Sequence, residues 1–185
     1  MISQEEGLKL LQLARNSISS CLEDKDVPID SYHRAHFSAK RGCFVSLHKD
    51  AELRGCIGFP EPIMPLHQAV VQAAQAAAFE DPRFPPIDKD ELERITIEIS
   101  VLSELQPINA KNEADYLRAI EIGKDGLVIK LGHSSGLLLP QVAIEYHWSG
   151  QEFLEHLCLK AGLPQNSWRD KGSKIYKFQA TIVSE

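Results

Sequence analysis

The sequence predicts a mixed α+β fold whose strands pair mainly in antiparallel fashion. Several short stretches alternate between apolar and polar residues, as half-buried strands do, and others repeat their apolar residues at helical spacing. Long polar loops separate the strands, and the regular strand–helix–strand order of a parallel sheet is missing. We therefore expect antiparallel sheets flanked by helices.

Three stretches have the pattern of helices. Ser3 and Glu6 have the spacing of a capping box, and apolar residues then recur at helical intervals over residues 5–22. An alanine-rich run over residues 65–79 carries one thin stripe of glutamines, so this helix is expected to be mostly buried. A third helix is expected over residues 151–161.

The expected strands lie between these helices and after them. Residues 43–47 and 53–57 are short apolar runs around a polar break, which indicates a hairpin. Residues 95–101 alternate strictly, residues 120–139 indicate a meander, and residues 174–183 form a last strand. The polar segment 27–40 is expected to be a loop.

Length, charge and cysteine usage indicate an ordinary cytoplasmic protein. The 185 residues suit one domain, and the net charge of −6 disfavours a general nucleic-acid binder. No apolar stretch is long enough to cross a membrane, and no signal peptide is expected. The four cysteines are widely and irregularly spaced, which favours reduced thiols.

No cofactor or metal is expected from motifs. Neither a Walker loop nor a dinucleotide fingerprint is present. His33, His36 and His48 lack a carboxylate at a recognisable metal spacing, so they are interpreted as surface histidines. Residues 132–136 match the G-x-S-x-G pattern, but the context is strand–turn–strand rather than strand–turn–helix, which argues against a serine hydrolase.

The segment 53–58, LRGCIG, carries the most chemistry. In a regular strand Arg54 and Cys56 share a face about 7 Å apart, and a nearby guanidinium favours the thiolate. Pairing of Leu47 with Leu53 buries the aliphatic side chains together, which is how register is usually fixed. The alternative is a cysteine that packs as a small hydrophobe beside an arginine in a structural ion pair.

Several segments together resemble one known family. They are LRGCIG at 53–58, FEDPRFPP at 79–86, EISVL at 98–102, GLLLPQVA at 136–143 with Glu145 and Trp148, and KAGLP at 160–164 with Trp168. This set resembles the AMMECR domain family from about residue 7 onward. Cys43 and Phe59 depart from the residues more common in that family.

The resemblance implies a single domain over residues 1–185 made of two unequal lobes packed as one unit. Each lobe is built on an antiparallel sheet, and the smaller lobe comes from the middle of the chain. The resemblance also implies a stand-alone cytosolic protein with Memo-type and radical-SAM proteins as partners. It supplies no activity, although roles in nucleic-acid metabolism are associated with the family.

Two functional interpretations remain open at this stage. In the first, the chain is an enzyme that acts on a small anionic substrate in a cleft beside the hairpin, with Cys56 as nucleophile or redox thiol. Glu145 or Glu98 then carries the proton. Substrate binding falls to four residues: Arg54, Asp81, Arg83 and Gln141. In the second interpretation the motif shapes a docking surface for a partner protein, since fold resemblance does not establish chemistry.

Overall fold

The computed structural model describes residues 2–185, which form two compact units. The first contains the chain up to Leu102 together with residues 181–185, and the second contains residues 103–180. Helices and antiparallel strands occur in both units, so the α+β class is confirmed. The assignment of both units to one domain with a smaller lobe stays a prediction.

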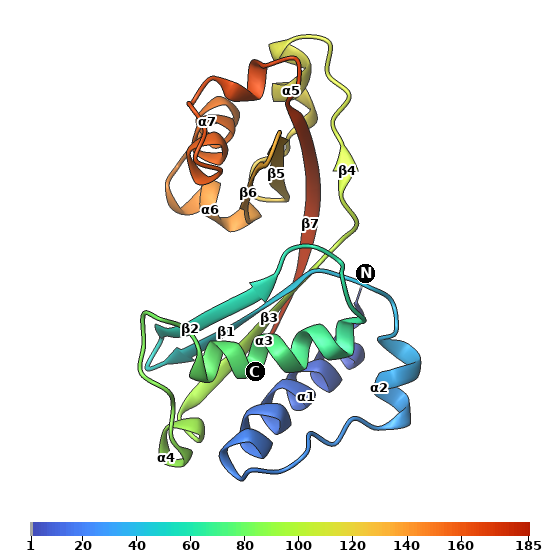
Figure 1. The fold of residues 1–185 in the computed structure, drawn as a ribbon, viewed down its shortest axis with the longest axis vertical. Coiled ribbons are helices and arrows are strands. Elements are labelled where there is room, and N and C mark those ends of the chain that lie inside the picture. Colours follow the sequence, from blue (N-terminus) through green and yellow to red (C-terminus); the bar gives the residue numbers. More distant parts are fainter. Residues whose placement is uncertain (1) are drawn as a thin grey trace. The chain divides into compact units, whose positions relative to one another are not determined.

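The first unit is a sheet with helices packed on one face (Figure 1). Its elements are α1 (Gln4–Leu22), α2 (Ser31–His36), β1 (Cys43–Lys49), β2 (Glu52–Phe59), α3 (Leu66–Phe79), α4 (Lys89–Leu92) and β3 (Ile95–Leu102). Strand β1 lies between β2 and β3 and is antiparallel to both. The end of β7 (Lys174–Ser184) lies beside β3, where the N–H of Glu185 donates to the carbonyl of Ile97 at 3.2 Å.

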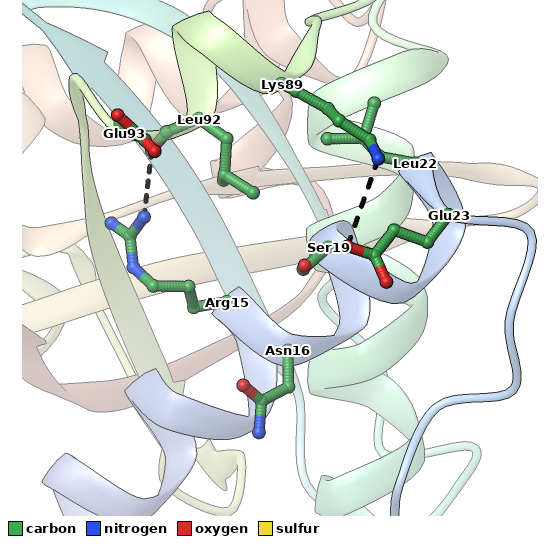
Figure 2. A pocket seen from close by; sticks show the side chains of 8 residues that line it. All are labelled: Arg15, Asn16, Ser19, Leu22, Glu23, Lys89, Leu92 and Glu93. Carbon is green, nitrogen blue, oxygen red and sulfur yellow. Dashed lines mark hydrogen bonds and ion pairs between the residues drawn. The ribbon is translucent and has the colours of Figure 1, made fainter.

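Helix α1 begins as the sequence predicts and is held at its middle by Arg15. The capping box is confirmed, since Ser3 Oγ accepts from the N–H of Glu6 at 3.2 Å and Glu6 Oε2 accepts from that of Ser3 at 2.8 Å. Arg15 donates to the carbonyls of Leu92 and Ile95 and to the carboxylate of Glu185. Arg15 therefore joins α1 to α4, to β3 and to the end of β7. Arg15 also lines the pocket shown in Figure 2.

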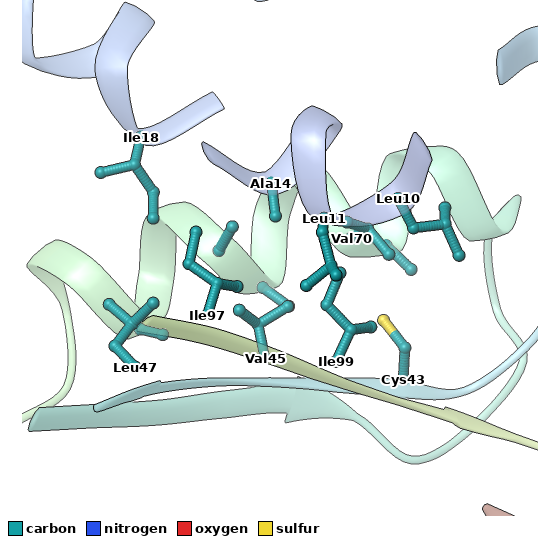
Figure 3. Packing of buried hydrophobic residues seen from close by; sticks show 14 of the residues in the cluster. Leu10, Leu11, Ala14, Ile18, Cys43, Val45, Leu47, Val70, Ile97 and Ile99 are labelled. Atoms are coloured by element: carbon teal, nitrogen blue, oxygen red, sulfur yellow. The ribbon is translucent and has the colours of Figure 1, made fainter. Parts of the chain in front are cut away.

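The core of the first unit lies between α1, α3 and the sheet (Figure 3). Cys43, Val45 and Leu47 of β1 are fully buried under the helices, as are Ile97 and Ile99 of β3. Alternate residues of a strand share a face, so these odd-numbered side chains point one way and their even-numbered neighbours the other. Burial of each aliphatic side chain contributes about 1.5–3 kcal/mol, which fixes the face that each strand presents to the helices.

The second unit has the same plan on a smaller scale. Its elements are β4 (Gln106–Pro107), α5 (Glu113–Ala119), β5 (Asp125–Leu131), β6 (Ser134–Leu138), α6 (Pro140–Glu145), α7 (Gly150–Lys160), the 3₁₀ helix η1 (Ser167–Arg169) and most of β7. Strands β4 and β5 both pair with β7, and β6 pairs with β5. The centre of the core is made by Leu127, Ile129, Phe153, Leu157, Trp168 and Ile175. Among residues 2–185, no helix is long and apolar enough to span a bilayer.

The segment 27–40 differs from the prediction, because it contains the short helix α2. Asp30 caps this helix by accepting the N–H of His33 at 2.9 Å, and the same oxygen lies 2.6 Å from His33 Nδ1. His33 is buried, so its interpretation as a surface histidine is wrong, whereas His36 is exposed. A helix of six residues can form with one cap and one buried face. It is too short for a periodic pattern of apolar residues to reveal it in the sequence.

Two glycines of the hairpin allow the backbone to pack closely. A Cβ added to Gly55 would lie 2.2 Å from the carbonyl oxygen of Ala77 in α3. A Cβ added to Gly58 would lie 2.4 Å from the carbonyl oxygen of Cys43 in β1. Both obstacles are backbone atoms, which cannot turn aside as a side chain can. These glycines therefore bring β2 close to α3 and β1.

The substitution Gly55→Ala is expected to destabilise the protein by about 1–3 kcal/mol, because overpacking at this contact forces the strand or the helix to shift. Urea unfolding followed by circular dichroism measures the change. Gly150→Ala is the matched control, since its added Cβ meets only Leu117 Cδ2 at 3.5 Å, an ordinary contact. Equal stability of Gly55→Ala and the wild type would show that the close approach is not required.

Candidate functional site

The LRGCIG motif lies on β2, the edge strand of the first unit's sheet, and the loop after α3 covers that edge. Asp81 Oδ2 accepts the backbone N–H of Cys56 at 2.9 Å, and Arg83 Nη2 donates to the carbonyl oxygen of Cys56 at 3.3 Å. An uncovered edge strand exposes such groups to pairing with other chains. The loop thus satisfies both backbone groups of the cysteine and fixes its position.

Asp81 and Arg83 form a tight pair within this loop. Arg83 Nε and Nη2 donate to the two carboxylate oxygens of Asp81 at 3.0 and 2.7 Å, and the N–H of Arg83 donates to Oδ1 at 3.1 Å. These hydrogen bonds, together with the one from the N–H of Cys56, hold the pKa of the Asp81 carboxyl well below its usual value despite its burial. The Arg83 side chain remains 53% exposed, so one side of the guanidinium faces solvent.

Arg54 is engaged by a second carboxylate, Glu91 of α4. Its Nε and Nη2 donate to Glu91 at 2.8 and 3.0 Å, and Lys49 Nζ donates to the same carboxylate at 2.9 Å. These bonds from Arg54 and Lys49 lower the pKa of Glu91 to about 2. Within residues 2–185, Arg54 Nη1 is buried and lacks a hydrogen-bond partner. Phe84 lies between the two arginines, with its ring centre 5.8 Å from the Arg54 guanidinium and 5.4 Å from that of Arg83.

The register of the hairpin differs from the prediction. Ser46 lies opposite Cys56 and Leu47 opposite Gly55, whereas the pairing expected for Leu47 was with Leu53. The register shifts between Leu47 and His48, which leaves Arg54 as the extra residue of a β-bulge. A bulge interrupts the alternation of side chains. The prediction that Arg54 and Cys56 share a face assumed unbroken alternation along β2. The bulge interrupts this alternation at Arg54, whose guanidinium binds Glu91.

The corrected register places three polar side chains in a row. Cys56 and Glu98 both lie directly opposite Ser46, one on each neighbouring strand. Opposed residues in an antiparallel sheet share a face, so the row lies on the face turned away from α1 and α3. Ser46 Oγ donates to Cys56 Sγ at 3.3 Å. All three side chains are half-buried.

Sequence reasoning missed three participants, namely Ser46, Phe84 and Glu91. The predicted register placed Arg54 opposite Ser46, so only the bulge brings this hydroxyl to the thiol. A signal for Glu91 does exist, because Asp88 three residues earlier has the spacing of an N-cap, and its side chain accepts the N–H of Glu91. That signal places a helix but does not identify its ion-pair partner.

Two predicted site residues lie in the second unit. Gln141 and Glu145 are both on α6, which begins at Pro140 directly after the apolar strand β6. Glu145 is exposed, and Gln141 Oε1 is buried with no hydrogen-bond partner in the part of the chain that the structure describes. Since the other predicted residues belong to the first unit, the single cleft that includes all of them stays a prediction.

The four thiols differ in their surroundings. Cys43 on β1 and Cys158 on α7 are buried in the two cores. Burial raises the pKa of Cys43 to about 12 and also raises that of Cys158. Cys56 is half-buried and Cys21 is exposed on α1. Across residues 2–185, no three histidine, cysteine or acidic side chains are grouped as metal ligands would be.

Fold and site together define a class: a two-unit α+β protein with an arginine–cysteine hairpin fastened to a proline-rich acidic loop. The chain belongs to the AMMECR1 family, whose family model matches residues 11–183. The expectation drawn from the five sequence segments is thus confirmed.

Relatives and a solved structure agree with this membership. Protein MJ0810 of Methanocaldococcus jannaschii is 49% identical over 187 residues, covering 100% of this chain and 92% of that protein. A protein of Methanothermobacter thermautotrophicus is 44% identical over 185 residues, covering 100% of this chain and 96% of that protein. The crystal structure of the uncharacterized protein PH0010 from Pyrococcus horikoshii matches with a TM-score of 0.89 and 42% identity, over 100% of this chain and 93% of that one.

The two low-pKa carboxylates predict a loss of stability in acid. A carboxyl whose pKa is lower in the folded than in the unfolded chain stabilises the fold above its unfolded pKa, and this contribution is lost as the pH falls through the folded value. For Glu91 the window runs from about 4.5, near the unfolded value, down to about 2. Glu91→Gln should cost about 1–3 kcal/mol at pH 7 and should flatten the decline over that window.

Urea midpoints measured at intervals from pH 7 to pH 2 test this expectation. Glu104→Gln is the control, because this side chain is exposed and its removal should leave both the stability and the pH profile within experimental error. A Glu91→Gln profile parallel to that of the wild type would show that the Arg54–Glu91–Lys49 cluster does not contribute to acid stability.

Proposed function

We propose that this chain is an enzyme that acts on a small anionic substrate at Cys56. The observation that carries the proposal is the row of thiol, hydroxyl and carboxylate formed by Cys56, Ser46 and Glu98. A covalent catalyst needs a nucleophile, a group that orients it, and a group that carries protons. Cys56 is assigned the first role, Ser46 the second and Glu98 the third.

The spacing of the row limits how the carboxylate takes part. Cys56 and Glu98 are separated by β1, so their Cα atoms are about 10 Å apart, twice the usual distance between strands. A substrate bound over Ser46 then lies between the thiol and the carboxylate, and Glu98 exchanges protons with the substrate rather than with the thiol directly. Glu145 on α6 stays the alternative candidate for the proton carrier.

Arg83 is the group best suited to hold the anion. Its guanidinium bonds the carbonyl of Cys56, and its side chain is 53% exposed, whereas that of Arg54 is only 12% exposed. Asp81 positions Arg83 and neutralises part of its charge, which favours a modest affinity for anions. Arg54 is proposed to assist through Nη1, which is buried and has no hydrogen-bond partner among residues 2–185. Gln141 on α6 stays a candidate for substrate binding.

A purely structural role for the motif accounts for part of the arrangement. It explains the ion pairs of Arg54 and Arg83 and the covering of the β2 edge, since both stabilise the fold. It does not explain why a half-buried thiol, a hydroxyl that donates to it and a carboxylate lie together on the face away from the core. The grouping of these three side chains therefore favours a reaction at Cys56.

The proposal is tested by turnover of unlabelled anionic metabolites. The purified protein is incubated with a small-molecule extract of its own host, and the loss of individual compounds is followed by mass spectrometry. The wild type and Cys21→Ser, which alters the exposed thiol on α1, should consume the same anionic compound. Cys56→Ser should consume it at least 100-fold more slowly, the usual scale for the loss of a catalytic group.

Retention of the activity in Cys56→Ser, or consumption of no compound by the wild type, would contradict the proposal. Arg83→Gln separates binding from chemistry, since loss of an anion-holding group should raise KM more than it lowers kcat. The same change in Arg94→Gln, an exposed arginine paired with Asp50, should leave both constants unaltered.

A second candidate is a docking module for the Memo-type or radical-SAM proteins that the family resemblance implies as partners. The observation that favours it is an aromatic stack in the second unit. Tyr146 lies over Trp148, with ring centres 4.9 Å apart, and Trp148 lies over His156 at 3.8 Å. Tyr146 is 64% exposed. Exposed tyrosine and tryptophan side chains are enriched at the energetic centres of protein interfaces.

Affinity measurements with purified Memo-type and radical-SAM proteins from the same host distinguish this candidate. Tyr146→Ala is expected to weaken the complex at least ten-fold, in line with the loss of about 1.4 kcal/mol or more at an interface centre. Leu8→Ala removes an equally exposed apolar side chain from α1 and should leave the affinity within two-fold. If neither protein binds the wild type, the docking module is excluded for these partners.

A further inference from the structure

The second unit contains a cavity of about 420 Å³ that is separate from the candidate site at Cys56. It lies between the segment that leads into α5 and the turn that joins η1 to β7. The side chains most relevant to its chemistry are Lys111, Tyr116, Trp168, Arg169, Lys171 and Ser173. All of them belong to the same unit, so the cavity is complete within it. Its volume is within the usual range for small-molecule sites.

Two residues in the lining of this cavity each have a buried hydrogen-bond donor without a partner. Of the four buried side-chain nitrogen or oxygen atoms without a partner among residues 2–185, two are Trp168 Nε1 and Ser173 Oγ. Trp168 is only 1% exposed, and its indole N–H can donate but cannot accept. A buried polar group without a partner destabilises the folded chain. Two such groups on residues that line one small cavity indicate that an acceptor normally meets them.

The charges around the cavity favour an anionic acceptor. Lys111, Arg169 and Lys171 supply three positive charges, against two negative charges from Glu113 and Asp170. Arg169 is already paired with Glu113 at 2.9 Å. The positive balance of the cavity therefore comes from Lys111 and Lys171, which belong to the two segments that line it. A carboxylate or phosphate oxygen suits both the positive charge and the two free donors.

Aromatic packing holds the tryptophan in place. Tyr116 meets Trp168 edge to face, with ring centres 5.8 Å apart, and the Arg169 guanidinium lies 4.3 Å from the centre of the Trp168 ring. Each contact restricts the indole, so Nε1 cannot readily turn to find another partner. The donor is fixed before a ligand arrives, and a preorganised donor contributes more to binding than a mobile one.

We propose that this cavity binds a small oxyanion, a carboxylate or phosphate group whose oxygens accept from Trp168 Nε1 and Ser173 Oγ while Lys111 and Lys171 neutralise its charge. The site is independent of Cys56 and of the reaction proposed there. It supplies the second unit with a ligand-binding role of its own.

Trp168 itself provides the readout. The chain contains two tryptophans, so Trp148→Phe leaves Trp168 as the only one. Emission of this variant is followed while potassium phosphate or potassium succinate is added, with potassium chloride at equal ionic strength as the reference. A saturating change with phosphate alone identifies a phosphate site, and one with succinate alone identifies a carboxylate site. The same emission in all three salts would overturn the proposal.

Two variants show whether the anion is held by the lining of the cavity. Lys171→Gln and Ser173→Ala should each raise the dissociation constant at least three-fold, because each removes one contact to the anion. Lys160→Gln is the matched control, since it removes an exposed positive charge from α7 outside the cavity. An equal change in Lys171→Gln and Lys160→Gln would mean that only general charge attraction is measured, and the proposal would be wrong.

A second measurement on the unmodified chain does not depend on Trp148→Phe folding correctly. A ligand that binds the folded state raises the thermal midpoint by an amount that grows with its concentration. The midpoint should rise with the anion that changes the emission and should remain constant in chloride. Identical midpoints in phosphate, succinate and chloride would contradict the proposal.

Discussion

The buried carboxylate of Asp81 is the group that fixes the candidate site. It accepts the N–H of Cys56 from β2, the N–H of Arg83 from the loop, and the Arg83 guanidinium. One side chain thus links the segment after α3 to the edge strand and orients the cation beside the thiol. A buried charge is tolerated only when its hydrogen bonds are complete, so removal of any of these donors weakens the others.

Glu91 provides a second point at which this loop is attached to β2. Glu91 binds Arg54 from the same strand, and Phe84 lies between the two arginines. The loop is therefore fastened to β2 at two points, with three prolines (Pro82, Pro85 and Pro86) that restrict its backbone in between. This rigidity keeps Arg83 close to Cys56 at little further cost in conformational entropy, which is what either a substrate-binding site or a docking surface requires.

The sequence predicted most elements, because periodicity reports burial directly. Helices α1 and α3 and strand β3 follow patterns of many residues, whereas α2 is too short for a pattern. The contact of Asp81 and Arg83 with Cys56 was expected only as a convergence, since 25 residues or more separate them. Ser46 was missed because the extra residue Arg54 shifts the pairing of β1 with β2. The alternation of apolar and polar residues along a strand does not reveal such a bulge.

Strand β7 has a consequence for how the protein is made. Its residues up to Ala180 belong to the second unit, and the five residues that follow belong to the first. Synthesis on the ribosome therefore delivers the whole second unit before the first can add its last strand and close the bond between Arg15 and Glu185. Until then the outer edge of β3 is without this neighbour. The inserted unit is free to fold before residues 181–185 leave the exit tunnel.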